Sequence, residues 1–183
     1  MDGALQEVPT SLKARFLDAM SRGVSMVNVV TTDGEAGRFG ATVSAMSAVS
    51  ADMDPPTLLV CLNQGGATAQ AIVRNRTFCL NFLHESQSAV ADCLAGRART
   101  ASGDKFDCAT WSRSGLAHWR LAGALASFDC HVLKAEPVGA HLVIFGSADA
   151  IGVGDVGRAL LYGARAYCAP SSLASAEPAH RRP

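Results

Sequence analysis

The sequence has no surplus of charge of either sign, because 16 lysines and arginines balance 16 aspartates and glutamates among 183 residues. A nucleic-acid-binding domain or a protein attracted to anionic membranes needs clustered positive charge, which this composition does not supply. No apolar run approaches the roughly 18 residues of a membrane-spanning helix, and the N-terminus carries acids instead of an apolar signal segment. We therefore expect a cytoplasmic protein with no nucleic-acid or membrane partner and favour a small-molecule ligand.

Fingerprints of metal and dinucleotide binding are also missing. The six cysteines include no C-x-x-C pair and no Cys/His cluster at zinc spacing, so no metal site is predicted. Cys61, Cys79 and Cys130 lie in apolar, strand-like stretches, where a thiol behaves as a small hydrophobic group. Cys130 is followed by His131, but neighbouring strand residues point to opposite faces and cannot act as nucleophile and base. The G-x-G-x-x-G pattern of dinucleotide-binding folds does not follow any predicted strand.

The length of the chain predicts a single domain that buries about 70% of the surface of the unfolded chain. We place this domain at residues 1–169. Residues 170–183 are rich in Ala, Ser and Pro and have little to bury, so they are predicted to be a disordered tail.

A short amphipathic helix is predicted near the N-terminus. Leu12, Phe16 and Met20 recur at helical spacing, and Thr10 or Ser11 is suited to cap the helix start.

Most of the remaining pattern is typical of antiparallel strands. The turn sequence DGEAG predicts a hairpin between a strand at residues 24–32 and a strand that begins at Phe39. Further strands are expected at residues 57–62, 77–83, 121–134 and 141–151, with helices around Ala69 to Val73 and from Glu85 or Ser86 to Gly96. Six or seven such strands favour a small closed or split barrel over a parallel sheet.

The stretch from Phe39 to Asn63 carries the clearest functional signal. Short hydroxyl side chains at Thr42, Ser44, Ser47 and Ser50 alternate with small apolar residues, so a ligand can approach the backbone and find hydrogen-bond donors. After a Pro-Pro turn, residues 57–62 form a continuous apolar run, typical of a strand buried on both faces.

Three further positions each leave two interpretations open. Gly65 and Gly66 run into a helix at Thr68, which suits a phosphate but also suits an ordinary capped loop, and spacing alone favours the loop. Arg97, just past a helix end, is either solvated or in contact with an anion. His141 opens a strand at the rim of the fold, where a histidine is more often incidental than functional.

Taken together and in order, eight segments between Val24 and Tyr167 resemble the flavin reductase-like family of FMN-binding split barrels. These segments are TTDGEAGRFGATVSA, DPPTLLVCLN, TFCLNFL, AGR, DKF, SFDCHV, GAHLVIFG and YGARAY. Within the family, the chain is most similar to reductase components of two-component flavin-dependent monooxygenases. The resemblance implies a homodimeric, mainly β protein: a six-stranded antiparallel split β-barrel of Greek-key type with short flanking helices.

The resemblance also implies an activity. A family member binds FMN or FAD near the subunit interface, lets NADH or NADPH reduce it by hydride transfer, and supplies the reduced flavin to a separate monooxygenase. Hydride transfer of this kind requires no general base, so no residue is assigned a catalytic role. Two alternatives stay open, namely a protein that holds its flavin tightly and reduces its own substrate, and a flavin-binding module without turnover.

Residue by residue, the resemblance places two groups of side chains at ligands. The flavin contacts are expected at Thr42, Val43, Ser44, Ala45, Ser47, Ser50, Asn63, Gly66, Thr68, Asn81, Phe82, Arg97, Lys105 and Phe106. The nicotinamide nucleotide is expected at His141, Arg165 and Tyr167.

Two positions depart from the family pattern. Ala48 and Gly66 stand where the family often has serine, so two hydroxyl groups that would bind the phosphate are missing. Glycine N–H groups are expected to replace them, and the choices between FMN and FAD and between NADH and NADPH stay open.

Overall fold

A computed structural model describes residues 11–114 and 118–173 of the chain. Its main element is a seven-stranded sheet in which every pair of neighbouring strands is antiparallel. From one edge to the other, the strands are β3 (Phe39–Val43), β2 (Asn28–Thr32), β6 (Thr77–Phe82), β9 (Ala126–Val138), β10 (His141–Val153), β5 (Thr57–Asn63) and β4 (Met46–Ser50). The mainly β, antiparallel prediction is confirmed, whereas the sheet has seven strands instead of the expected six.

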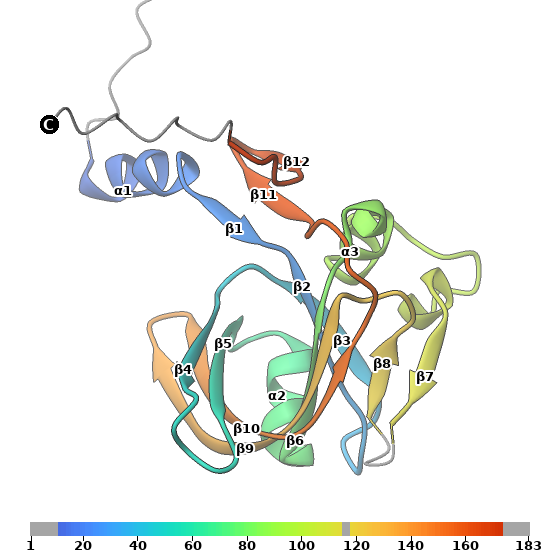
Figure 1. Cartoon of the computed structure of the whole chain (residues 1–183). Helices are drawn as coiled ribbons and strands as arrows, with labels where there is room; N and C mark the ends of the chain where they lie inside the picture. Colours follow the sequence, from blue (N-terminus) through green and yellow to red (C-terminus); the bar gives the residue numbers. More distant parts are fainter. Residues whose placement is uncertain (1–10, 115–117, 174–183) are drawn as a thin grey trace, which may run out of the picture.

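The sheet curls round until its two edges meet at one point. The edge strands β3 and β4 are consecutive in the chain and are joined by only Ser44 and Ala45. The carbonyl of Ala45 accepts a hydrogen bond of 2.9 Å from the Cys61 amide of β5, which fixes this crossing. Since β3 and β4 do not pair with each other, the sheet is curled without being closed (Figure 1).

Two small sheets flank the main sheet. One contains β1 (Val24–Met26), β11 (Leu161–Gly163) and β12 (Ala166–Cys168), and the other contains β7 (Trp111–Arg113) and β8 (Trp119–Leu121). Figure 1 shows the three-stranded sheet standing beyond the main sheet, close to the N-terminal helix.

The helices are short and differ in how far they are buried. They are α1 (Leu12–Ser21), α2 (Ala67–Asn75), the 3-10 turn η1 (Glu85–Gln87), α3 (Ser88–Leu94) and the 3-10 turn η2 (Lys105–Cys108). The predicted cap of α1 is confirmed, because the Ser11 side chain accepts from the Ala14 amide at 3.2 Å. Thr10, the other candidate cap, lies outside the described residues. None of the described helices is long and apolar enough to cross a membrane.

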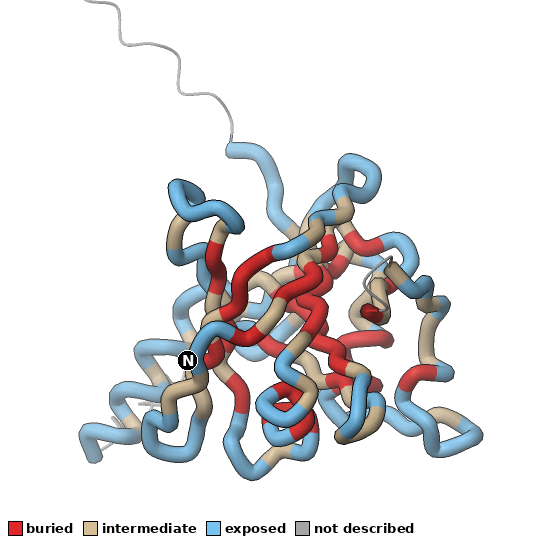
Figure 2. The backbone as a smooth tube through the Cα atoms, turned by 90° about the horizontal axis from the view of Figure 1, so that it is seen from below, coloured by how far each residue is buried: buried red, intermediate tan, exposed pale blue. Residues whose placement is uncertain are grey.

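The core lies inside the curled sheet, and α2 closes it. Ala69 and Ile72 of α2 pack in one cluster with Val30, Phe78 and Ile144 of the sheet. A second cluster holds α3 against β2, through Val90 and Leu94 of the helix and Val29 of the strand. In Figure 2 the buried residues gather in the middle of the molecule, and the exposed ones form the loops and rim.

Three predicted strands are each divided in the structure. The strand predicted at residues 24–32 is two strands, β1 and β2, which belong to different sheets. The hydroxyl-rich stretch at residues 39–50 is two strands, β3 and β4, because the chain passes from one edge of the sheet to the other at Ser44 and Ala45. The predicted strand at 121–134 is divided by a turn at Gly123, whose φ of +72° suits glycine, into the ends of β8 and β9. Of the predicted tail, residues 170–173 form no helix or strand, and residues 174–183 lie outside the described chain.

Candidate functional site

A cleft of about 640 Å³ opens along β3, between α2 on one side and the end of α3 with η2 on the other. This volume lies within the roughly 300–1,000 Å³ typical of small-molecule sites. Its lining residues are Arg38, Phe39, Gly40, Ala41, Thr42, Leu62, Asn63, Gly66, Ala67, Thr68, Ala69, Leu94, Ala95, Gly103, Asp104, Lys105 and Phe106.

The floor of this cleft is the open edge of β3, which offers backbone donors. The Thr68 hydroxyl donates to the Gly40 carbonyl at 3.1 Å, so the polar groups of Gly40 point away from β2. N–H and C=O groups of one residue share a direction in a strand, and the direction alternates along the chain. The N–H groups of Gly40 and Thr42 therefore face the cleft, whereas Ala41 and Val43 pair with β2.

The start of α2 forms one end of the cleft and favours an anion. Gly66 is the N-cap, has no side chain to cap the helix, and no acidic residue follows in the first turn. The N–H groups of Gly65 and Gly66 are both bonded to Asn63, at 2.9 and 3.0 Å. The donors that remain for a ligand are therefore those of the first helical turn, which begins at Ala67.

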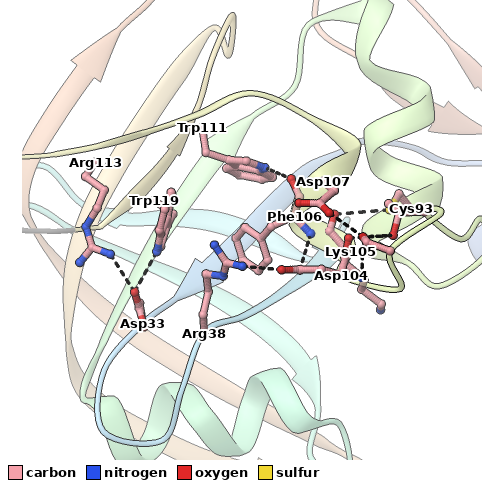
Figure 3. Close-up of polar contacts among 12 residues, drawn as sticks. Asp33, Arg38, Cys93, Asp104, Lys105, Phe106, Asp107, Trp111, Arg113 and Trp119 are labelled. Atoms are coloured by element: carbon pink, nitrogen blue, oxygen red, sulfur yellow. Dashed lines mark hydrogen bonds and ion pairs between the residues drawn. The ribbon is translucent and has the colours of Figure 1, made fainter.

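Opposite α2, an arginine and a lysine give the cleft a cationic wall (Figure 3). Arg38 Nη2 lies 2.5 Å from Asp104 Oδ2, and the guanidinium carbon lies 4.4 Å from the centre of the Phe106 ring. The Lys105 Nζ donates to the Leu94 carbonyl at 3.2 Å. Two cations and one carboxylate leave this wall with net positive charge.

The wall is fixed by hydrogen bonds within the loop that carries η2. Asp104 Oδ1 accepts from the Phe106 amide at 2.9 Å, which caps the 3-10 turn. The Trp111 Nε1 donates to the Phe106 carbonyl at 2.7 Å and ties the turn to β7. These contacts hold Phe106 and its neighbours in place beside the cleft.

A second cleft of about 210 Å³ adjoins the first and shares Thr42 and Ala95 with it. Its other lining residues are Val27, Ser44, Arg97, Tyr162 and Tyr167. A three-residue network forms its wall, in which Asp92 accepts from Arg97 at 2.7 Å and from Tyr167 at 2.9 Å, and Arg97 also contacts the Tyr167 hydroxyl.

The network shifts the ionisation of its members in opposite directions. Hydrogen bonds from Arg97 and then Tyr167 lower the pKa of Asp92. Burial, followed by the hydrogen bond to Asp92, raises the pKa of Tyr167. At neutral pH, Asp92 is therefore a carboxylate and Tyr167 a neutral phenol. Their contacts hold Arg97 at the edge of the smaller cleft.

The structure brings many of the predicted flavin residues together. Thr42, Asn63, Gly66, Thr68, Lys105 and Phe106 line the larger cleft, and Ser44 and Arg97 line the smaller one. The hydroxyls of Thr42 and Thr68 already donate to the carbonyls of Ala91 and Gly40. Their side chains therefore position the cleft walls, and backbone N–H groups supply its donors.

Other predicted flavin residues lie elsewhere. The Asn81 side chain is fully buried, its Oδ1 accepts from the Leu121 amide and the Ser127 hydroxyl, and it lines neither cleft, so its flavin contact stays a prediction. Val43 packs in the core.

The third group of predicted residues lies on or near β4. Ser50 and Phe82 line a separate apolar pocket of about 170 Å³, together with Met46 and Phe128. Ala45 and Ser47 are exposed and line neither of the two clefts along β3. These positions follow from the division of the hydroxyl-rich stretch, which sends Ser47 and Ser50 to the opposite edge of the sheet.

The three residues predicted at the nicotinamide nucleotide are separated. His141 pairs in register with Asn63 and is exposed, so it lies beside one end of the larger cleft. Tyr167 lines the smaller cleft, and Arg165 is exposed at the turn between β11 and β12 with a left-handed φ of +63°. Neither cleft contains all three.

Arg38, Gly40 and Asp104 were not predicted, although they line the cleft. Gly40 allows close packing, because a Cβ there would lie 2.5 Å from Leu94 Cδ1. Gly40 and Thr42 share one face of β3, and Arg38 directly precedes the strand in the same two-residue spacing, which was the pattern in the sequence that could have indicated these residues. Among the described residues, no group of three or more His, Cys, Asp and Glu is arranged to hold a metal ion.

Comparisons with known proteins agree with this arrangement. The sequence profile of the Flavin reductase like domain matches residues 20–171. An FMN reductase (NADH) of Methylorubrum extorquens, RutF 1, is 42% identical over 154 residues, which cover 84% of this chain and 75% of that protein.

Solved structures show the same similarity. The styrene monooxygenase flavin reductase of Pseudomonas putida S12 has a TM-score of 0.75 at 25% identity, covering 86% of this chain and 99% of that one. BorF, the flavin reductase component of a bacterial two-component tryptophan halogenase, has a TM-score of 0.76 at 27% identity, covering 87% and 99%. The chain described here therefore belongs to the flavin reductase like domain family.

Proposed function

We propose that this protein is an NADH-dependent flavin reductase that binds FMN in the cleft along β3 and releases the reduced flavin to a separate monooxygenase. The observation that carries the proposal is the cleft itself, which combines an open strand edge with an uncapped helix start. The family match and the 42% identical FMN reductase (NADH) support the same activity.

The donors of the cleft suit the parts of a flavin nucleotide. The first turn of α2 is suited to the phosphate, because its N–H groups and the helix dipole favour an anion. The Gly40 and Thr42 N–H groups along β3 are suited to the polar edge of the ring. Their small side chains let the ring approach the backbone.

The protein's contribution to the reaction is positioning and electrostatics. When bound, a flavin supplies the hydride-accepting ring, and the donor is the nicotinamide of NADH. The N–H groups of Gly40 and Thr42 are placed to stabilise negative charge on the ring, and the cleft walls hold the reactants in contact. His141 beside Asn63, and Tyr167 with Arg97 in the adjoining cleft, are the proposed contacts of the nucleotide.

We also propose that the protein works as a homodimer. The helix α1 has no buried residue, and its predicted stripe leaves Leu12, Phe16 and Met20 exposed by 83, 61 and 62%. An apolar helix face of this kind is typical of a surface that a partner covers, and a second copy is the occupant proposed here. Ser47 and Ser50, which lie outside the clefts, keep their predicted flavin role only if a second copy brings them to its site.

The test is NADH consumption by the purified protein with and without added FMN. We expect a colourless protein that oxidises NADH only when FMN is added and that prefers NADH to NADPH. A yellow protein with stoichiometric flavin would instead indicate a prosthetic group and a substrate of its own. A protein that binds FMN but consumes no NADH would be a flavin-binding module, and the proposal would be wrong.

A further inference from the structure

One end of the larger cleft carries a guanidinium group that is both accessible and firmly held. Arg38 has five N–H donors, and among the described residues the hydrogen bond from Nη2 to Asp104 is the only one that it makes. Its guanidinium carbon lies 4.4 Å from the centre of the Phe106 ring and 5.0 Å from that of Trp119. The side chain is 33% exposed, so an anion can reach it.

This end of the cleft is distinct from the start of α2. Arg38 precedes β3, whereas the Thr68 hydroxyl of α2 meets Gly40 two residues further along. The cleft therefore has two anion-favouring positions, one at the first turn of α2 and one at Arg38 with Lys105. Two positions in one cleft match the two linked phosphates of a dinucleotide better than a single phosphate.

We propose that Arg38 and Lys105 form a second phosphate subsite that recognises the pyrophosphate of FAD, and that Asp104 limits it by competing for Arg38. The proposal rests on the proposed function, because it places the flavin phosphate of either nucleotide at α2. A planar guanidinium binds phosphate oxygens with two parallel hydrogen bonds, which suits this role. The exposure of Arg38 and Asp104, 33 and 43%, leaves the adenosine room to extend into solvent.

Asp104 is suited to give way to a phosphate without collapse of the wall. Its Oδ1 accepts from the Phe106 amide at 2.9 Å, and only Oδ2 is bonded to Arg38. Asp104→Asn keeps an oxygen for the Phe106 amide and removes the charge that competes with a ligand. This substitution therefore separates the competing role of Asp104 from its capping role.

The experiment measures the dissociation constants of riboflavin, FMN and FAD for the full chain by fluorescence titration. Arg38→Gln is expected to raise the dissociation constant of FAD about tenfold, because one charged hydrogen bond is lost. The dissociation constant of FMN should change by less than about twofold. Asp104→Asn is expected to tighten FAD about threefold and to leave riboflavin unchanged. Arg113→Gln is the matched control. The Arg113 guanidinium carbon also lies 4.9 Å from the centre of the Trp119 ring, and Arg113 pairs with Asp33, but this arginine does not line the cleft.

The three ligands separate the possible outcomes. Equal losses for FMN and FAD would place Arg38 at the phosphate that both share, and a loss that includes riboflavin would make Arg38 a support of the wall. Either result, or no change in FAD affinity, overturns the subsite. If one of these results is found and the unaltered protein still reduces FMN normally, the second phosphate subsite is wrong and the proposed function stands. If it binds none of the three flavins, the proposed function fails with it.

Discussion

Arg120 and Asp129 form the most deeply buried arginine–carboxylate pair among the described residues. The Asp129 side chain is fully buried, and Arg120 donates to it through Nε at 3.2 Å and through Nη2 at 2.8 Å. Burial by itself would raise the pKa of Asp129, but hydrogen bonds from Arg120, Ser114 and Cys79 outweigh it and lower the pKa. The carboxylate therefore depends on its partners to stay charged inside the protein.

Removing Arg120 leaves this carboxylate without its main partner. We expect Arg120→Ala to lower the free energy of unfolding by about 3 kcal/mol, as measured by urea denaturation at neutral pH. The matched control is Arg113→Ala, which removes a half-exposed pair with Asp33 and should cost less than about 1 kcal/mol. Equal effects of the two substitutions would show that burial does not set the strength of the Asp129 pair.

The same pair predicts how stability responds to acid. The folded pKa of Asp129 lies below its unfolded value of about 3.9, so its contribution is fully present above that pH. The contribution is lost as the pH falls through the lower, folded pKa. The difference in unfolding free energy between the unaltered protein and Arg120→Ala should therefore shrink below about pH 4, and a difference that is constant down to about pH 2 would contradict this.

His141 tests the nucleotide side of the site at the same scale. It is exposed and in register with Asn63 at the end of the larger cleft, away from the β3 edge proposed for the flavin ring. We expect His141→Ala to raise the KM for NADH about tenfold, the value of one modest hydrogen bond, with FMN affinity unchanged. If FMN affinity falls by the same factor, or NADH binding is unaffected, His141 is not a nucleotide contact.

At the scale of elements, α2 links the core to the proposed phosphate site. Its Ala69 and Ile72 pack inside the curled sheet, and its first turn faces the cleft. Because the core fixes the helix, the N–H groups of its first turn are held in place before a ligand arrives.

Two substitutions at Gly66 test this element. Proline has no N–H group, so it would remove the hydrogen bond from Gly66 to the Asn63 carbonyl, 3.0 Å, that closes the turn before α2. Gly66→Pro should therefore abolish FMN binding. Gly66→Ser supplies a side-chain cap, so it should stabilise the helix by a few tenths of a kcal/mol and leave FMN affinity similar or slightly tighter. Titrations with FMN and riboflavin check both. Riboflavin that binds as tightly as FMN would show that no phosphate is bound at α2.

The elements with strong local patterns were predictable from the sequence. Residues 57–62 form a continuous apolar run and residues 77–83 a largely apolar one, and they correspond to the inner strands β5 and β6 of the main sheet. The break at Ser44 and Ala45 was not predictable, because small residues fit an unbroken strand and a crossing between sheet edges equally well.

The cleft was predictable only in part, because some of its residues are brought together from distant parts of the chain. Thr42, Gly66 and Thr68 gave local signals, whereas Arg38 and Asp104 meet across 66 positions in the chain. Asn81 was assigned to the flavin from the family resemblance alone, and its burial in the core, where it accepts from Leu121 and Ser127, had no signal in the sequence. Contacts that depend on how distant segments fold together leave no pattern in a single sequence.

At the scale of the whole molecule, the exposed stripe of α1 predicts self-association. We expect sedimentation of the full chain at micromolar concentration to show a dimer, and Phe16→Ser to shift it toward monomer because an apolar contact is lost. The control Arg15→Ser changes an exposed residue outside the stripe and should leave the dimer intact. A stable monomer of the unaltered chain would contradict the proposed assembly.

The central claim is that the whole molecule turns over flavin as a substrate, and anaerobic reduction of FMN tests it most directly. With NADH in excess and the protein at about one hundredth of the FMN concentration, we predict that the visible absorbance of all the FMN is bleached. This result requires each chain to bind, reduce and release many flavins. Bleaching that stops at one FMN per chain, or no bleaching beyond the rate without protein, would contradict the account.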